Sequence, residues 1–187
     1  VIGEITEKEA LVLFFFLILL STSLLLWMNY LTFLMALIGL MLAIIYPLTK
    51  RFFSIPQIFL GLAFSWGIIM VSTAELNEVT EISLLLFTSC FFWIMAYDTA
   101  YALCDKEDDL GIGINSSAIV FGENVRIFFY IFHIISLSVL ILVSYILDFH
   151  FSFYFKILFN HLLMYELFIV IILKFNIILL KISIASV

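Results

Sequence analysis

Charge is the property that this sequence has least of. Only 12% of its 187 residues are Asp, Glu, Lys or Arg, whereas 66% are hydrophobic. A soluble domain of this size cannot bury so much apolar surface, so the lipid bilayer must be the solvent for most of the chain. The eight basic residues form no patch, which argues against nucleic acid as a partner. The composition therefore predicts an all-α integral membrane protein.

Cysteine and proline are also scarce, with two residues of each. Cys90 and Cys104 lack CxxC spacing, which argues against a zinc site and predicts two small residues in the core. The three histidines show no ligand spacing either. No linker rich in Gly, Ser or Pro and no repeat of fixed period divides the chain. We therefore expect residues 1–187 to form a single transmembrane domain.

Long apolar segments recur along the chain, and most are near the roughly 20 residues that a helix needs to cross a bilayer. The first follows a capping box of Thr6 and Glu9, which predicts a helix start at Glu7. The second is short, and we expect it to end before Pro47, since proline lacks the N–H that a helix interior uses. The predicted crossings are 10–28, 32–46, 56–74, 82–104, 125–147 and 151–173, and the weakly apolar tail, 175–187, adds at most a partial seventh.

The basic residues favour one orientation of these six crossings. If the N-terminus is cytoplasmic, the cytoplasmic side holds every basic residue except Lys156, which satisfies the positive-inside rule. The opposite connections carry acidic residues instead. The predicted cytoplasmic set is Lys8, Lys50, Arg51, Lys106, Arg126, Lys174 and Lys181.

Three carboxylates in otherwise apolar surroundings, Asp98, Asp105 and Asp109, mark a candidate functional site. At 100° per residue, one continuous helix would hold all three within about 40° of each other. Carboxylates at membrane depth are costly, so function is the default hypothesis. Their mutual repulsion would be relieved by Mg²⁺, which is commonly held by one or two carboxylates together with substrate phosphates. The pattern predicts a membrane site for a metal-bound phosphate ester.

Two connections on the predicted cytoplasmic side could complete this site. Lys50 and Arg51 fit a diphosphate clamp, because both donate charge-assisted hydrogen bonds to phosphate oxygens, but they also fit a topology anchor. The second connection, 106–122, is expected to be a polar loop in which Gly111 and Gly113 permit tight turns. A solvated connector would look similar, although it would not need an acidic edge that continues into the membrane.

The stretch YDTAYALCDKEDDLGIGINSSAIVFG, residues 97–122, resembles the second aspartate-rich motif of the UbiA superfamily of membrane prenyltransferases. Its form, YDTxYAxxDxxDD followed by GxxSxAxxFG, is similar to that of the members that prenylate 4-hydroxybenzoate in ubiquinone biosynthesis. TEKEA, YPLTKRF, Pro56-Gln57, Gly61 and Ser65-Trp66 occur upstream in a similar order and spacing. The resemblance covers about residues 3–122 well and the rest weakly. It implies a bundle of nine transmembrane helices, of which this chain would hold six or seven.

The resemblance also implies a reaction and the residues that perform it. A polyprenyl group would pass from polyprenyl diphosphate to the ring carbon ortho to the hydroxyl of 4-hydroxybenzoate, at a bacterial inner membrane. Asp105 and Asp109 match the family's DxxxD, so they would be catalytic and would bind Mg²⁺, with Asp98 as a supporting catalytic carboxylate. Tyr46 and Tyr101 would face the developing carbocation. The implied substrate-binding residues are Lys50, Arg51, Tyr46, Tyr101 and Lys106.

This sequence departs from the family pattern in one respect that bears on activity. The family's first aspartate-rich motif, NDxxDxxxD, occurs nowhere in it. We therefore expect the chain to correspond to the central part of such an enzyme, without its first two helices, and to show little activity alone. Three alternatives stay open: a haem O or menaquinone-pathway member of the superfamily, a transporter or proton relay with carboxylates near the bilayer midplane, and a non-catalytic, decayed membrane fragment.

Overall fold

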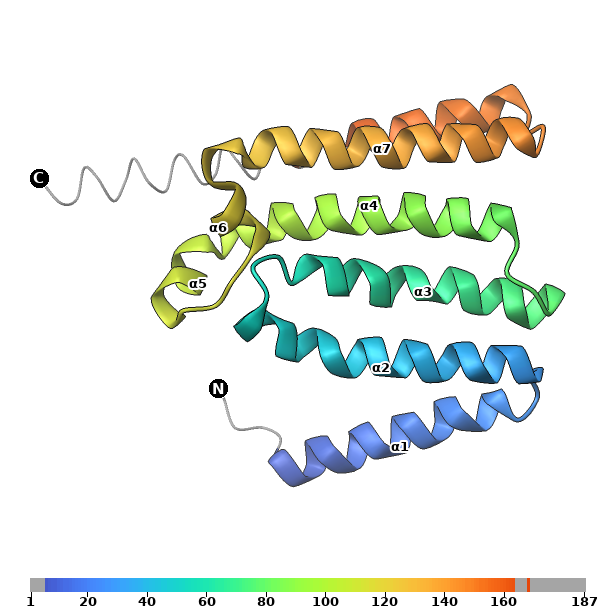
Figure 1. The fold of residues 1–187 in the computed structure, drawn as a ribbon, viewed down its shortest axis with the longest axis horizontal. Coiled ribbons are helices and arrows are strands. Elements are labelled where there is room, and N and C mark those ends of the chain that lie inside the picture. The colour runs from blue at the N-terminus through green and yellow to red at the C-terminus, as the bar shows by residue number, and fades with distance from the viewer. Residues whose placement is uncertain (1–5, 164–167, 169–187) are drawn as a thin grey trace, which may run out of the picture.

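The computed structural model describes residues 6–163 and Phe168, and every element within them is helical. The long helices run back and forth side by side, and two short helices cap one end of the bundle (Figure 1). The long helices are α1 (Glu7–Leu25), α2 (Tyr30–Phe52), α3 (Gln57–Leu76), α4 (Glu81–Cys104) and α7 (Val125–Ile146). The short elements are α5 (Lys106–Ile112), α6 (Ser117–Phe121) and the single turn η1 (Gly122–Asn124), and a further helical segment, 151–163, follows α7.

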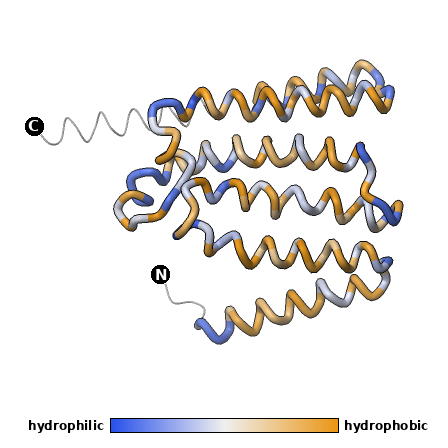
Figure 2. The backbone as a smooth tube through the Cα atoms, in the orientation of Figure 1, coloured by the Kyte–Doolittle hydropathy of each residue, from blue (hydrophilic) through white to orange (hydrophobic). Residues whose placement is uncertain are grey.

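Five helical spans within the described residues are long and apolar enough to cross a membrane. Their apolar stretches lie along the helices, and the polar residues gather at the connections (Figure 2). The all-α membrane bundle predicted from the sequence is therefore confirmed. The sixth predicted crossing is helical over 151–163. Its remaining residues, and the tail that was considered for a partial seventh crossing, lie outside the described residues.

Helix starts follow the local capping chemistry. The backbone N–H of Thr6 donates to the Glu9 carboxylate at 2.8 Å, and the N–H of Glu9 donates to the Thr6 hydroxyl at 3.3 Å. This confirms the predicted capping box and the helix start at Glu7. Asn29 and Thr80 cap α2 and α4 in the same way, each accepting a backbone N–H three residues on.

The predicted end of the second crossing before Pro47 is wrong. α2 continues through Pro47 to Phe52. Proline removes one helical donor, but the bonds beyond it persist: the N–H of Phe53 donates to the Thr49 carbonyl at 2.8 Å. As a result, Lys50 and Arg51 occupy the last turn of a helix, where cations complement the partial negative charge of the free carbonyls.

α4 is the central helix, since it packs against both α3 and α7, while α3 also packs against α2. The approach of α3 to α4 is close at Gly61, where a Cβ atom would lie 2.9 Å from the ring of Phe91. Polar groups also join the helices across the apolar interior. The Trp66 indole N–H donates to the Met35 carbonyl at 2.8 Å, and the Ser89 hydroxyl donates to the Ser136 carbonyl at 2.9 Å.

Both cysteines are free thiols. Cys90 is half-buried, but Cys104 is exposed, so the prediction of a core position is wrong for Cys104. The reason is its place at the last residue of α4, where the helix reaches the end of the bundle.

Candidate functional site

The three predicted carboxylates do not share one continuous helix. α4 ends at Cys104, Asp105 stands at the junction with φ −93° and ψ 2°, and α5 begins at Lys106. The acidic first turn of α5 favours a new helix N-terminus here, because negative side chains complement the free N–H groups. The prediction of one uninterrupted acidic edge is therefore wrong.

The carboxylates nevertheless gather at one end of the bundle. Asp98 is half-buried on α4 and interacts electrostatically with Asp105 and Asp109. The backbone N–H of Asp109 donates to the Asp105 carbonyl at 2.9 Å, so these two residues stand one turn apart. Lys50 from α2 interacts electrostatically with Asp98 and supplies a positive charge. The three carboxylates thus stay near one another although the helix is interrupted between Asp98 and Asp109.

Tyr46 belongs to the same neighbourhood, since it interacts electrostatically with the Asp98 carboxylate. Its side chain is half-buried on α2, one helical turn before Lys50. The structure therefore brings together five of the predicted site residues, namely Tyr46, Lys50, Asp98, Asp105 and Asp109. Arg51 is exposed and Lys106 half-buried beside this cluster in the sequence, and within residues 6–163 no hydrogen bond or ion pair joins either side chain to the carboxylates.

Hydrogen bonds from the backbone and from side chains hold the segment after Asp105 and Asp109 against its neighbours. The N–H of Asn115 donates to the Lys50 carbonyl at 3.2 Å, which ties the connection after α5 to the end of α2. The N–H of Ser117 donates to the Gln57 side-chain carbonyl at 3.0 Å, and the Ser117 and Thr99 hydroxyls lie 2.9 Å apart. Gln57, Thr99 and Ser117 are all buried.

The expected polar loop of residues 106–122 is largely helical, so that prediction is wrong. Gly111 lies inside α5 and makes no turn. Gly113 ends the helix at φ 71°, a left-handed conformation that glycine adopts without steric cost. The N–H of Ile114 then donates to the Asp109 carbonyl at 2.9 Å, a bond that satisfies one of the free carbonyls at the end of α5.

Aromatic rings form a ladder along α4 on the way to the carboxylates. Trp93 stacks on Tyr97 with ring centroids 5.8 Å apart, and Tyr97 contacts Tyr101 at 4.7 Å. The Tyr97 hydroxyl donates to the Tyr101 hydroxyl at 3.1 Å. Tyr101 is predicted as a site residue, whereas Tyr97 and Trp93 are not. Their spacing of four residues on one helix is the signal that reveals them.

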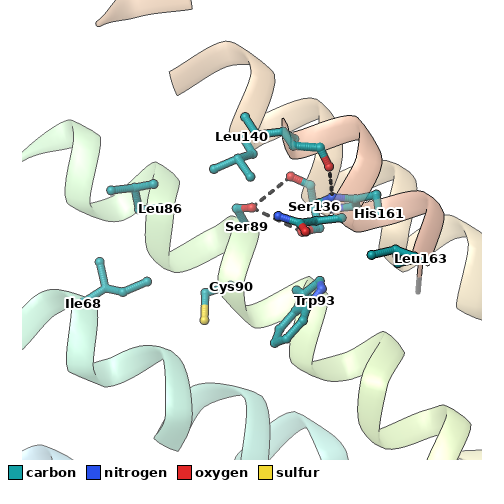
Figure 3. A pocket seen from close by; sticks show the side chains of 11 residues that line it. Ile68, Leu86, Ser89, Cys90, Trp93, Ser136, Leu140, His161 and Leu163 are labelled. Carbon is teal, nitrogen blue, oxygen red and sulfur yellow. Dashed lines mark hydrogen bonds between the residues drawn. The ribbon is translucent and has the colours of Figure 1, made fainter. Parts of the chain in front are cut away.

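Trp93 also borders a pocket of about 580 Å³ between α3, α4, α7 and the segment 151–163. Most of its lining is apolar, with Ser89 and Ser136 hydrogen-bonded to each other on one wall (Figure 3). The aromatic ladder therefore begins at an apolar hollow and ends near the acidic cluster.

These residues could bind a divalent metal only together with ligands from another molecule, such as phosphate oxygens of a substrate. No group of three or more His, Cys, Asp or Glu side chains within the described part of the chain could hold a metal ion alone. Asp105 and Asp109 offer two hard oxygen donors one turn apart, with Asp98 and Lys50 nearby. Mg²⁺ keeps open positions and is often held by one or two carboxylates plus substrate phosphates. The donor set fits Mg²⁺ that is bound jointly with a phosphate ester.

Fold and site together define a polytopic membrane protein whose helices present acidic side chains and a lysine at one end. Comparison with known families identifies it more closely. Residues 1–176 match the UbiA prenyltransferase family, and the chain belongs to that family. No solved structure matches the chain.

Several curated proteins similar to this chain carry a common name, 4-hydroxybenzoate octaprenyltransferase. The protein from Alcanivorax borkumensis is 48% identical over 152 residues, which cover 81% of this chain and 52% of the relative. Another from Photobacterium profundum is 43% identical over 83% of this chain and 54% of its own length. One from Neisseria meningitidis is 54% identical over 65% of this chain and 41% of its own length. The chain thus spans about half the length of the relatives it matches.

Proposed function

We propose that the protein transfers a polyprenyl group from a polyprenyl diphosphate to the ring carbon ortho to the hydroxyl of 4-hydroxybenzoate, in ubiquinone biosynthesis. The observation that carries this proposal is the cluster of Asp105, Asp109, Asp98 and Lys50 at one end of a membrane-spanning bundle. Family membership and the names of the relatives support the same substrates.

The diphosphate would bind where the acidic cluster meets the end of α2. Asp105 and Asp109 would hold Mg²⁺, which supplies positive charge against the diphosphate oxygens when bound. Lys50 lies within electrostatic reach of Asp98 and would donate to the same oxygens. Arg51, in the same helical turn, and Lys106, at the start of α5, would add further donors. These charges stabilise the leaving group as negative charge develops on it.

Chemistry would then proceed at the first allylic carbon. The C–O bond to the diphosphate breaks, and the bonding electrons leave with the diphosphate. The aromatic carbon ortho to the hydroxyl forms the new C–C bond and afterwards loses its proton. Tyr46 and Tyr101 would present aromatic faces to the positive charge on the prenyl group.

The prenyl tail would extend from this point along the aromatic ladder. Trp93 and Tyr101 are eight residues apart on α4, which is about 12 Å along the helix axis. The pocket of about 580 Å³ beside Trp93 offers an apolar continuation for the distal part of the tail. Such walls would also exclude water, which otherwise captures the cation.

The distribution of basic residues supports a cytoplasmic position for the site. The end of the bundle that carries α5 and α6 holds most of the basic residues, namely Lys8, Lys50, Arg51, Lys106 and Arg126. Lys156 belongs to the segment 151–163, which starts at the opposite end. Lys174 and Lys181 lie outside the described residues. We propose that the protein resides in a bacterial inner membrane with its site toward the cytoplasm.

A transporter with carboxylates at the bilayer midplane is less compatible with this arrangement. Asp98 lies six residues before the end of α4, about 9 Å along the axis, and Asp105 and Asp109 lie beyond that end. The cluster therefore sits near the end of the membrane-spanning helices, where soluble phosphate esters and Mg²⁺ can reach it.

Substitution of Asp105→Asn or Asp109→Asn tests the proposed function. Each change keeps the side-chain shape but removes the negative charge that Mg²⁺ requires. We expect Mg²⁺-dependent binding of geranyl diphosphate by the chain in nanodiscs to fall at least roughly a hundredfold. Any prenyl transfer to 4-hydroxybenzoate that membranes with the wild-type protein show should fall by a similar factor.

Asp148→Asn is the matched control. Asp148 lies at the other end of the bundle with φ 52°, a left-handed conformation that asparagine also tolerates. This variant should bind and react like the wild type. Near-normal binding and transfer by both the Asp105 and Asp109 variants would refute the assigned site.

A further inference from the structure

Two apolar pockets lie next to each other along α3 and α4. The pocket of about 580 Å³ beside Trp93 shares two lining residues, Ile68 and Leu86, with a second pocket of about 450 Å³. Figure 3 shows both side chains at the end of the first pocket that lies away from Trp93. We call the second pocket, lined by residues of 67–76 and 80–86, the distal pocket. Because the two pockets share part of their walls, they form one continuous groove.

One face of α4 joins this groove to the acidic end of the bundle. A row of side chains spaced three or four residues apart lines the two pockets and then continues as the aromatic ladder, and such a spacing keeps them on one side of a helix. The row consists of Ile82, Leu86, Cys90, Trp93, Tyr97 and Tyr101. Its ends are 19 residues apart, which is about 28 Å along the helix axis. The row therefore spans nearly all of the roughly 30 Å hydrocarbon core of a bilayer.

The distal pocket offers a hydrocarbon surface. Its hydroxyl groups are paired within the protein, since Ser72 donates to the Glu78 carbonyl at 2.8 Å and Ser83 donates to the Thr80 carbonyl at 2.7 Å. The exposed residue Glu75, next to the end of α3, marks where the apolar wall stops. An occupant that fits these walls is an apolar chain, because a polar molecule would find its hydrogen-bonding groups unpaired there.

Gly67 leaves the distal pocket open. It lines this pocket and is exposed, and an added Cβ atom would meet nothing within 4 Å. Gly61, on the same helix, differs because a Cβ atom there would lie 2.9 Å from the ring of Phe91. A larger residue at position 67 would therefore occupy free space in the groove and leave the packing of α3 against α4 in place.

We propose that the distal pocket receives the far end of the substrate's prenyl tail, and that Gly67 is a specificity-determining residue that keeps this pocket open for long tails. This inference rests on the proposed function, because a diphosphate held at the acidic end aligns the tail with the row on α4. With C–C bonds of about 1.5 Å, the main chain of a geranyl tail spans at most about 11 Å. Leu86 lies about 22 Å along the axis from Tyr101, so only a longer tail reaches the distal pocket.

Gly67→Phe tests this role, since its ring would fill the distal pocket. Mg²⁺-dependent binding of octaprenyl diphosphate and of geranyl diphosphate is measured with the chain in nanodiscs. We expect the affinity for octaprenyl diphosphate to fall about tenfold, because the ring and the tail cannot occupy the same space, and the affinity for geranyl diphosphate to stay unchanged. Gly67→Leu, which adds a smaller side chain, should show the same selectivity with a smaller loss.

Ser21→Phe is the matched control. Ser21 is an exposed small residue in a different apolar pocket, of about 590 Å³, between α1 and α2. That pocket shares no lining residue with the groove, so this variant should bind both diphosphates like the wild type.

Three outcomes of these binding measurements would overturn the proposal. They are wild-type affinity for octaprenyl diphosphate in both Gly67 variants, equal loss of both diphosphates in both Gly67 variants, and a selective loss of octaprenyl diphosphate in Ser21→Phe. A wild-type chain that binds neither diphosphate would count against the proposed function instead.

A photoreactive octaprenol, which carries a diazirine at the far end of its tail but no diphosphate, tests the groove by itself. Irradiation in nanodiscs should label peptides from 67–76 and 80–86, and this labelling should fall in Gly67→Phe but not in Ser21→Phe. If the groove holds only bilayer lipid, the label should spread over all membrane-facing helices. Such spread labelling, or undiminished labelling of Gly67→Phe, overturns the proposal whether or not the diphosphate binds.

Discussion

The close approach of α3 to α4 leads to a quantitative prediction at Gly61. A Cβ atom added there would lie 2.9 Å and 3.0 Å from two ring carbons of Phe91, and 3.4 Å from its carbonyl oxygen. The Phe91 ring is itself held edge-on against Phe92, with centroids 5.2 Å apart. Gly61→Ala should therefore push α3 and α4 apart. At Gly67, on the same helix, an added Cβ would meet nothing within 4 Å.

The comparison of the two alanine variants isolates the steric cost. Each replacement gains the helix propensity of alanine over glycine, about 1 kcal/mol, and this gain cancels in the difference. What remains is the cost of overpacking at Gly61, which is about 1–3 kcal/mol. We expect Gly61→Ala to have the lower free energy of unfolding by that amount.

Unfolding in mixed micelles with increasing SDS, followed by the helical circular dichroism signal, measures this difference. Equal unfolding free energies for the two variants would show that α3 and α4 are not in close contact at Gly61, and the reasoning would fail.

Two further predictions concern the acidic segment and its metal. Gly113→Ala places a side chain at φ 71° and should destabilise the end of α5 by roughly 1–2 kcal/mol. Limited proteolysis at the α5–α6 connection should therefore be faster in this variant than in the control Gly111→Ala, whose substitution lies inside the helix. Equal cleavage of the two variants would contradict the assigned turn. Removal of divalent cations with EDTA should abolish geranyl diphosphate binding by the chain, and added Mg²⁺ should restore it. Binding that persists in EDTA would argue against joint binding of metal and diphosphate.

Much of the architecture follows from the order of residues alone. Apolar runs near the length of a bilayer crossing must form helices, because only hydrogen bonds within the segment satisfy the backbone in lipid. The start of α1 at Glu7 was predictable for a similar reason, since the capping box of Thr6 and Glu9 is made by neighbours in the chain. Asp98, Asp105 and Asp109 stood out because carboxylates are costly in apolar surroundings.

Local signals were less reliable where the chain leaves the apolar region. Pro47 was expected to end α2, yet the helix continues because only one hydrogen bond is lost and the next ones persist. Asp105 was expected inside one helix, yet α4 ends before it and a second helix starts after it. In both cases the outcome depends on small energy differences at a helix end, which a pattern of residue types does not resolve.

The order of neighbouring residues therefore specified the membrane-spanning helices and pointed to the acidic residues, because apolar runs and capping groups are made by residues close together in the chain. The hydrogen bond from the Ser117 N–H to the Gln57 side chain joins residues that are far apart in the sequence, and it arises from how α3 and α6 pack together. A buried amide is oriented by whichever donors and acceptors surround it, so this contact became visible only once those neighbours were in place.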